Sequence, residues 1–108
     1  MGITKTSGFS ETQLKFGELF KVLGHPARMA IVEYLVNSPS CVCGDIVEEI
    51  PLAQSTISRH LKELKNANII QGTVEGNNIC YCLNENTINE ISSLIDSFGK
   101  KIKENKCC

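Results

Sequence analysis

The spacing of the apolar residues changes near residue 69, and this change constrains the fold of the chain more than any other feature. Up to about residue 66, apolar side chains recur at the spacing of amphipathic helices. Residues 69–74 and 78–83 are instead rich in β-formers, and the segment 75–77 between them is a β-hairpin signal. From about residue 86 the helical spacing returns. The sequence therefore predicts a mainly α-helical protein with a small β-hairpin.

The length and composition indicate a single domain over residues 1–108. Apolar residues make up 42% of the chain and charged residues 21%, as in globular proteins. No apolar run approaches the roughly 18 residues that span a bilayer, and the first residues lack the apolar region of a secretory signal. We therefore expect a cytoplasmic protein with no membrane partner. Because the cytosol is reducing, its six cysteines are expected to be free thiols.

Helices are expected on both sides of the hairpin. The first spans residues 11–23, and the second spans residues 26–36 because Pro26 is favoured at the first helical position. The last helix covers about residues 86–106, and its apolar stripe is wider than a small core needs. This surplus predicts a dimer.

Two further helices form a predicted helix-turn-helix over about residues 45–66. Asp45 and Glu48 resemble a capping box, which starts a short helix that Pro51 ends. Residues 53–66 form the next helix, and its N-terminal part is small, polar and rich in hydroxyl groups, so it can approach base edges without steric bulk. With the hairpin at about 69–84 as the wing, the pattern predicts a winged helix-turn-helix.

The exposed face of the helix at 53–66 carries the candidate DNA contacts. The formal net charge of the chain is -1, but this helix has a local excess of positive charge. Glutamine can pair with adenine, arginine with guanine or phosphate, and hydroxyl groups with phosphates or bases. His60 is expected on the core side as a structural histidine. The predicted DNA-binding residues are Gln54, Ser55, Thr56, Ser58, Arg59 and Lys62.

The chain resembles the ArsR/SmtB family of bacterial metal-responsive repressors. The resemblance rests on the run KVLGHPAR at 21–28, the run AQSTISRHLK at 53–62 and the hairpin that contains Tyr81. It implies a winged-helix homodimer, joined through the first and last helices, that occupies double-stranded operator DNA until an inducer binds. The hairpin departs from the family, because residues 75–78 lack the basic residues common there.

Cys41 and Cys43 are the candidate inducer ligands. With Val42 they resemble the Cys-Val-Cys motif of the arsenical-responsive branch, which opens the first helix of the helix-turn-helix. At a helix N-terminus the dipole lowers the pKa of a thiol, and an ion that gathers both thiols would distort the helix start and tilt the DNA-reading helix. Trivalent arsenic and antimony are soft and prefer about three thiolates. The third cysteine of the branch falls near Ile46 here, so a third thiolate must come from elsewhere.

Two sources can supply that third thiolate. In a winged helix the segment before the third helix can pair with the outer wing strand, which would bring Cys41 toward Cys80 or Cys82, and these two share one strand face. The alternative is the terminal pair Cys107 and Cys108, on a terminus mobile enough to reach the site. The distance that each segment would have to span slightly favours the wing strand as the source of the third thiolate.

Two other inducer chemistries and one other class of protein compete with this interpretation. The same cysteines could form a reversible cross-link in a thiol redox or persulfide sensor. Alternatively, Cys41, Cys43, Cys80 and Cys82 could hold zinc or cadmium as a tetrathiolate. An enzyme is not predicted, because the chain has no Cys-x-x-Cys pair and no glycine-rich phosphate loop. No resident cofactor is required.

Overall fold

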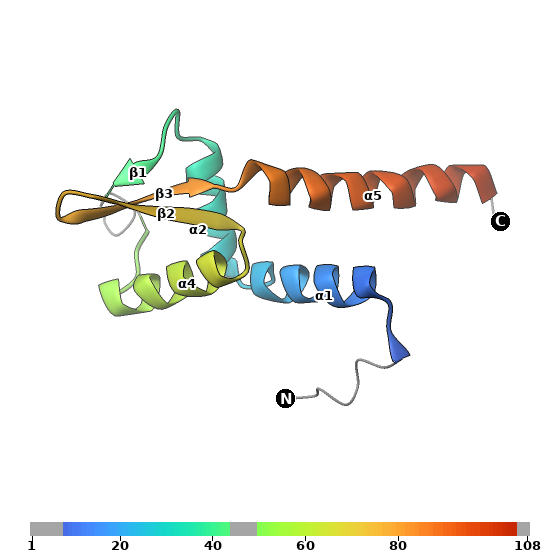
Figure 1. Cartoon of the computed structure of the whole chain (residues 1–108), viewed down its shortest axis with the longest axis horizontal. Coiled ribbons are helices and arrows are strands. Elements are labelled where there is room, and N and C mark those ends of the chain that lie inside the picture. Colours follow the sequence, from blue (N-terminus) through green and yellow to red (C-terminus); the bar gives the residue numbers. More distant parts are fainter. Residues whose placement is uncertain (1–7, 44–49, 106–108) are drawn as a thin grey trace.

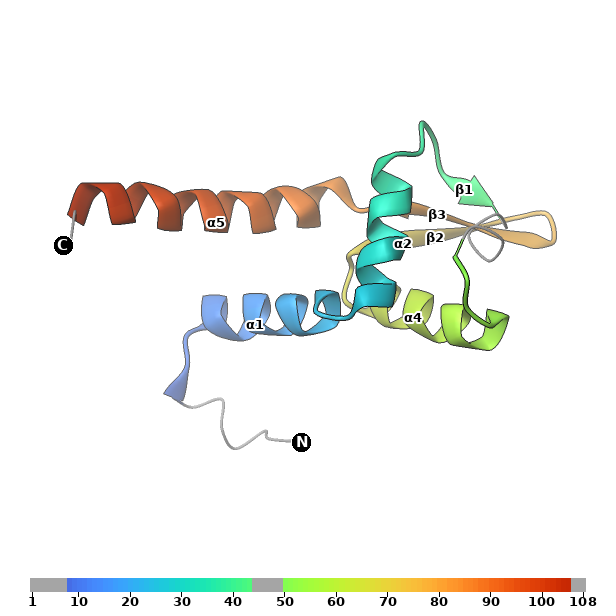
Figure 2. The same ribbon diagram turned by 180° about the vertical axis from the view of Figure 1, so that it is seen from behind.

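The computed structural model of the chain describes residues 8–43 and 50–105. In chain order its elements are α1 (Glu11–Leu23), α2 (Pro26–Val36), β1 (Val42–Cys43), α4 (Gln54–Asn66), β2 (Ile70–Glu75), β3 (Asn78–Leu83) and α5 (Glu85–Asn105). A body made of α2, α4 and the strands lies at one end, and α1 and α5 both extend from it in the same direction (Figure 1; Figure 2). The predicted combination of helices with a small β-hairpin is confirmed.

The first two helices begin where side chains satisfy their free backbone N–H groups. At the start of α1, Ser10 Oγ accepts a hydrogen bond from the Gln13 N–H at 3.1 Å, and Gln13 Oε1 accepts one from the Ser10 N–H at 3.0 Å. At the start of α2, His25 Nδ1 accepts a hydrogen bond from the Ala27 N–H at 3.0 Å, and Pro26 occupies the first helical position. The predicted bounds of both helices are confirmed.

Three antiparallel strands form one sheet in the order β1-β3-β2. β2 and β3 are the predicted hairpin, and Gly76 in its two-residue turn has a φ of 64°, which glycine adopts without strain. β1 pairs with the other side of β3, with Val42 opposite Tyr81 and Cys43 opposite Cys80. The predicted pairing of the segment before the helix-turn-helix with a wing strand is confirmed.

α4 is held in the core by one apolar face. Ile57, Leu61 and Leu64 are buried, as predicted, and burying a side chain of this kind stabilises the fold by about 1.5–3 kcal/mol relative to exposure. The core therefore determines which face of α4 is buried. The other members of the same cluster are Leu19, Val22, Ile31, Val32, Leu35, Val42, Ile50, Ile69 and Ile70.

The short helix predicted from Asp45 to Ile50 lies outside the described residues except for Ile50. Ile50 itself is buried in the core cluster. The chain between β1 and α4 is therefore attached to the body at its downstream end.

α5 begins at Glu85, one residue earlier than predicted, continues to the last described residue, Asn105, and leaves much of its apolar stripe exposed. Ile88 and Ile91 pack against the core, whereas Ile95, Phe98 and Ile102 are 51%, 52% and 70% exposed. The predicted surplus of apolar surface on this helix is confirmed. No helix in the described part of the chain is both long and apolar enough to cross a membrane.

Candidate nucleic-acid interface and cysteine site

The predicted DNA-binding residues share the polar face of α4. Because the apolar face is packed in the core, this polar face is directed away from it. No side chain caps the start of α4 at Ala53, and the helix dipole there favours an anion such as a phosphate. Gln54, Ser55, Ser58, Arg59 and Lys62 are exposed, and Thr56 is half-buried.

His60 lies on the buried side of α4, as predicted, and connects α4 to α2. It is 7% exposed, its Nδ1 accepts a hydrogen bond from Arg28 Nε at 3.0 Å, and its ring centroid lies 4.4 Å from that of His25. Arg28 Nη1 also donates to the backbone carbonyl of Val22, near the end of α1, at 3.2 Å. Burial lowers the pKa of His60 below its ordinary value of 6.5, and the positive charges of His25, Arg28 and Arg59 lower it further.

Arg28 was not predicted to have a role in the site. It belongs to the run 21–28 that carries the family resemblance, so a signal was present in the sequence. Its partner His60 is 32 residues further along the chain, however, and spacing over that distance does not indicate contact. Only the packing of α2 on α4 reveals the pair.

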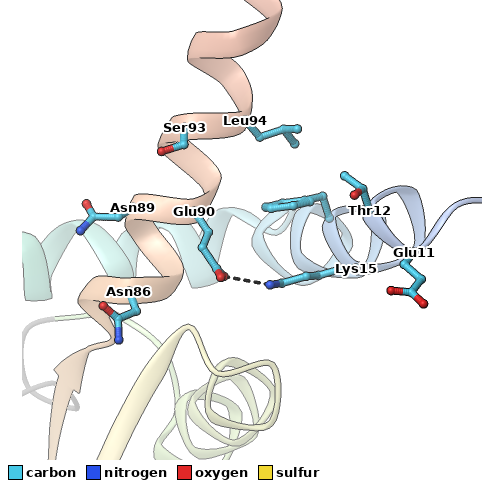
Figure 3. A pocket seen from close by; sticks show the side chains of 9 residues that line it. Glu11, Thr12, Lys15, Asn86, Asn89, Glu90, Ser93 and Leu94 are labelled. Carbon is cyan, nitrogen blue, oxygen red and sulfur yellow. Dashed lines mark ion pairs between the residues drawn. The ribbon is translucent and has the colours of Figure 1, made fainter.

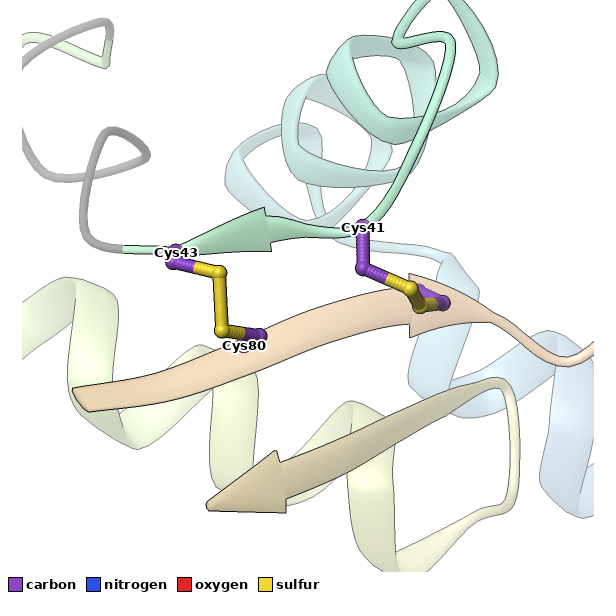
Figure 4. The surroundings of a disulfide bond; sticks show 4 residues. Cys41, Cys43 and Cys80 are labelled. Atoms are coloured by element: carbon purple, nitrogen blue, oxygen red, sulfur yellow. A yellow bond between two sulfur atoms is a disulfide. The ribbon is translucent and has the colours of Figure 1, made fainter. Parts of the chain in front are cut away.

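Four cysteines lie together on the ladder between β1 and β3 (Figure 4). The structure joins Cys43 to Cys80 and Cys41 to Cys82 by disulfides, with Cα–Cα distances of 4.1 and 4.6 Å. Residues two apart on a strand share a face, so both pairs project from the same side of the ladder. Cys41 and Cys43 are exposed, Cys82 is half-buried and Cys80 is only 1% exposed.

Two predictions about these cysteines are wrong. Free thiols were expected, but the antiparallel register places the cysteines in opposed pairs close enough to be joined as disulfides. Cys41 and Cys43 were also expected at a helix N-terminus. Cys43 is instead the last residue of β1 and Cys41 directly precedes that strand, so neither lies in a helix; the predicted helix start at Asp45 falls outside the described residues.

The register also bears on the third predicted ligand. Cys80 and Cys82 both lie beside the β1 pair, whereas Cys107 and Cys108 fall outside the described residues. With the cysteines in disulfides, the described residues contain no group of three or more His, Cys, Asp or Glu side chains that could hold a metal ion. A thiophilic ion would therefore need the reduced form of the cluster.

A groove between α1 and α5 lies apart from these sites (Figure 3). Lys15 Nζ lies 3.1 Å from Glu90 Oε1 across it, and both side chains are about half exposed. An ion pair this exposed contributes only about 0–1 kcal/mol. None of the predicted site residues lines the groove, whose other lining residues are Glu11, Thr12, Phe16, Asn86, Asn89, Ser93 and Leu94.

The fold and the exposed polar face of α4 define a winged helix-turn-helix DNA-binding protein. Residues 25–71 match the family described as bacterial regulatory protein, arsR family. The chain is also 36% identical over 102 residues to the arsenical resistance operon repressor of Bacillus subtilis (strain 168), which covers 92% of this chain and 95% of that protein. The chain therefore belongs to the arsR family and is a DNA-binding transcriptional repressor.

Other similarities agree with this assignment. The chain is 39% identical over 83 residues to an uncharacterized HTH-type transcriptional regulator of Methanocaldococcus jannaschii, covering 76% of this chain and 92% of that protein. An ArsR-like transcriptional regulator from Rhodococcus sp. RHA1 has the same fold, with a TM-score of 0.74 at 16% identity over 89% of this chain and 90% of that chain. The winged-helix fold predicted from the sequence is thus confirmed.

Proposed function

We propose that this chain binds operator DNA as a homodimer and leaves it when trivalent arsenic or antimony binds cysteine thiolates that include Cys41 and Cys43. The observation that carries the proposal is the pairing of β1 with β3, which brings Cys80 and Cys82 beside Cys41 and Cys43, the two cysteines that precede the segment leading to α4. The similarity to a repressor named for an arsenical resistance operon supports the same inducer class.

Among the described cysteines, we propose Cys82 as the third ligand. Arsenic and antimony in the trivalent state are soft and take about three thiolates, so Cys41 and Cys43 alone would bind weakly. Cys80 is 1% exposed, whereas Cys82 is half-buried and Cys41 and Cys43 are exposed. An ion that enters from solvent therefore meets the sulfurs of Cys41, Cys43 and Cys82 first, once reduction has freed them.

Ion binding would act on α4 through the position of β1. β1 is only two residues long, so backbone hydrogen bonds alone hold it weakly on β3. Three sulfur ligands around one ion would instead determine where β1 lies. Because the chain runs from Cys43 through the buried Ile50 to α4, a shift of β1 would tilt α4 relative to the DNA groove.

α4 is proposed to supply most of the DNA affinity. Residues 75–78 at the tip of the wing include one acid and no base, so the wing tip cannot form ion pairs with phosphates. On α4, Gln54 and Arg59 can read base edges, and Lys62 can contact the phosphate backbone. The described geometry places these three side chains on one exposed face.

The exposed apolar surface of α5 and α1 supports the homodimer. Ile95, Phe98 and Ile102 on α5 are at least half exposed, and Leu14 and Phe20 on α1 are each 40% exposed. Several large exposed apolar side chains on two helices that extend from the body in the same direction are typical of an interface between protein chains. A two-fold dimer would also present two copies of α4 to successive turns of one DNA groove.

A thiol redox switch is the second candidate function, and the two disulfides favour it. With hydrogen peroxide, the Cys41 thiolate would attack one oxygen, hydroxide would leave and a sulfenic acid would form. The Cys82 thiolate would then attack this sulfur, and hydroxide would leave as the disulfide forms. The two thiols lose two electrons, one peroxide is reduced, and two waters are produced.

The test is binding of the reduced protein to labelled DNA from upstream of its own gene, measured by fluorescence anisotropy. Phosphine-reduced protein is needed, because a dithiol reductant would itself bind arsenite. Arsenite, antimonite, zinc, cadmium and peroxide are compared. We expect arsenite and antimonite to release wild-type protein from DNA, and C43S and C82S to stay bound.

Two control variants sharpen this experiment. C80S and the double variant C107S/C108S should still be released by arsenite if Cys82 is the third ligand. Release of C82S but not of the terminal double variant would move the third thiolate to the C-terminus. Release by peroxide alone, with reversal by reductant, would replace the arsenical sensor by the redox switch, and release by zinc or cadmium alone would favour a tetrathiolate.

A further inference from the structure

We infer that Arg28 and His60 position the DNA-reading helix: the hydrogen bond from Arg28 to neutral His60 holds α4 in its DNA-binding orientation, and protonation of His60 releases it. The inference rests on the proposed role of α4 in DNA binding. It does not depend on which inducer acts at the cysteines.

The Arg28 guanidinium connects three helices through two hydrogen bonds. Its Nε donates to His60 Nδ1 on α4 at 3.0 Å, and its Nη1 donates to the Val22 carbonyl near the end of α1 at 3.2 Å. His60 is 7% exposed, so little solvent competes for its acceptor nitrogen. A shift of α1 or α2 is therefore transmitted to α4 at this point.

His60 is adjacent in sequence to Arg59, a predicted DNA contact. Neighbouring residues on a helix point about 100° apart, so the buried side chain of His60 sets the direction in which Arg59 leaves the helix. Loss of the contact to Arg28 would leave the apolar face of α4 in the core but would remove the polar contact that resists its rotation. Arg59 and its neighbours would then be misdirected at the DNA.

Protonation of His60 is incompatible with this hydrogen bond. Both ring nitrogens of an imidazolium are donors, so the Arg28 N–H would face another N–H. Among the described residues, the groups whose charge acts on His60 are His25 and Arg28 at the start of α2 and its chain neighbour Arg59 on α4, and all of these are basic. In the described part of the chain no carboxylate pairs with His60. A proton on His60 would thus separate it from Arg28.

The expected pH dependence is opposite to that of simple electrostatics. DNA is a polyanion, so a proton added beside Arg59 would by itself strengthen binding. If His60 positions α4 instead, operator affinity falls as the pH is lowered from about 8 to about 5, and the fall begins below the ordinary histidine range because burial lowers the pKa of His60. The sign of the change therefore separates the two roles.

Three variants test the inference, with affinity for the upstream DNA measured at both pH values in phosphine reductant. H60A removes the acceptor without changing the charge at the higher pH, and it should weaken binding about tenfold there. H60N supplies Oδ1 in place of Nδ1 and cannot be protonated, so it should bind nearly as well as wild type with no loss in acid. H25N removes the other histidine but keeps a residue that is favoured at a helix N-cap, and it should still lose operator affinity in acid.

R28M supplies an independent measurement. It removes the donor, so it should weaken binding while the dependence of affinity on salt stays that of wild type. R59M removes one positive charge, as R28M does, and serves as its control. If Arg59 contacts a phosphate, R59M should reduce the slope of log affinity against log salt concentration by about 0.9 in magnitude. Circular dichroism of each variant at both pH values establishes that the compared proteins are folded.

Several results would overturn the inference. The inference is wrong if the operator affinity of wild-type protein rises in acid, or if H60A binds as tightly as wild type. It is also wrong if the loss of affinity in acid persists in H60N or disappears in H25N. If H60A does not fold, the pH profile of H60N decides alone. Absence of specific binding by wild-type protein at both pH values would instead refute the proposed operator and, with it, this inference.

Discussion

The two disulfides close nested loops, and their contributions to stability should therefore be far from additive. Cys41 and Cys82 are 41 residues apart in sequence, and Cys43 and Cys80 are 37 apart. Either bond alone restricts the unfolded chain by about 4 kcal/mol in the loop-entropy account. Once one is closed, the other closes a ring of only about six residues and adds about 2 kcal/mol.

Pairwise alanine variants provide the test. In oxidised protein, C41A/C82A and C43A/C80A should each lose about 2 kcal/mol of unfolding free energy, whereas the quadruple variant should lose about 6 kcal/mol. The measurement is urea unfolding followed by circular dichroism, at one protomer concentration because a dimer's stability depends on it. Each variant is also unfolded in reductant, which removes the effect of the alanines themselves from the comparison.

Nested loop closure is refuted if each pair variant loses half of the unfolding free energy that the quadruple variant loses. Additive losses would mean that each bond acts on a separate part of the unfolded chain, which nested loops exclude. Reduced wild-type protein offers a second check, since it should unfold close to the oxidised quadruple variant. A reduced protein as stable as the oxidised one would show that the unfolded chain is not restrained by these bonds.

Three further predictions concern single side chains. Arg59→Ala should weaken operator binding by about 1–3 kcal/mol if Arg59 is bidentate to guanine, and anisotropy titrations that show no change would exclude it from the interface. The pKa of His60 is lowered in the folded protein, so the unfolded state binds more protons in acid. The urea concentration at the midpoint of unfolding should be constant above about pH 6.5 and fall at lower pH, and the fall should be smaller in H60N. An equal fall in wild type and H60N would show that His60 is not its cause. Phe98→Asp should convert the proposed dimer to a monomer in sedimentation velocity, and a variant that sediments as a dimer would place the interface elsewhere.

Much of the fold could be predicted because its signals are local. Pro26 marks the start of α2, and the apolar spacing across 11–23 outlines α1. Gly76 suits the turn of the hairpin because its φ is positive. The polar face of α4 follows from helical geometry alone once its apolar residues are recognised. Each of these features depends on residues within a few positions of one another.

The cysteine cluster shows where local reasoning was insufficient. Cys41 and Cys43 were predicted at a helix start, because the motif that they resemble lies there in the related branch. A strand of two residues has no periodicity of its own, and β1 exists because β3 supplies its partner. The prediction that this segment reaches Cys80 and Cys82 was correct, but it required knowledge of how winged helices pack.

The sequence by itself determined which surfaces this protein has: an apolar face and a polar face on α4, a hairpin with no basic residue at its tip, and an apolar stripe on α5 that is wider than the core needs. Only the tertiary structure decided which cysteines meet and that Arg28 holds His60. The physical reason is distance along the chain. Helical and hairpin signals act over a few residues, whereas these contacts join residues 32 to 41 positions apart, and only the shared core brings them together.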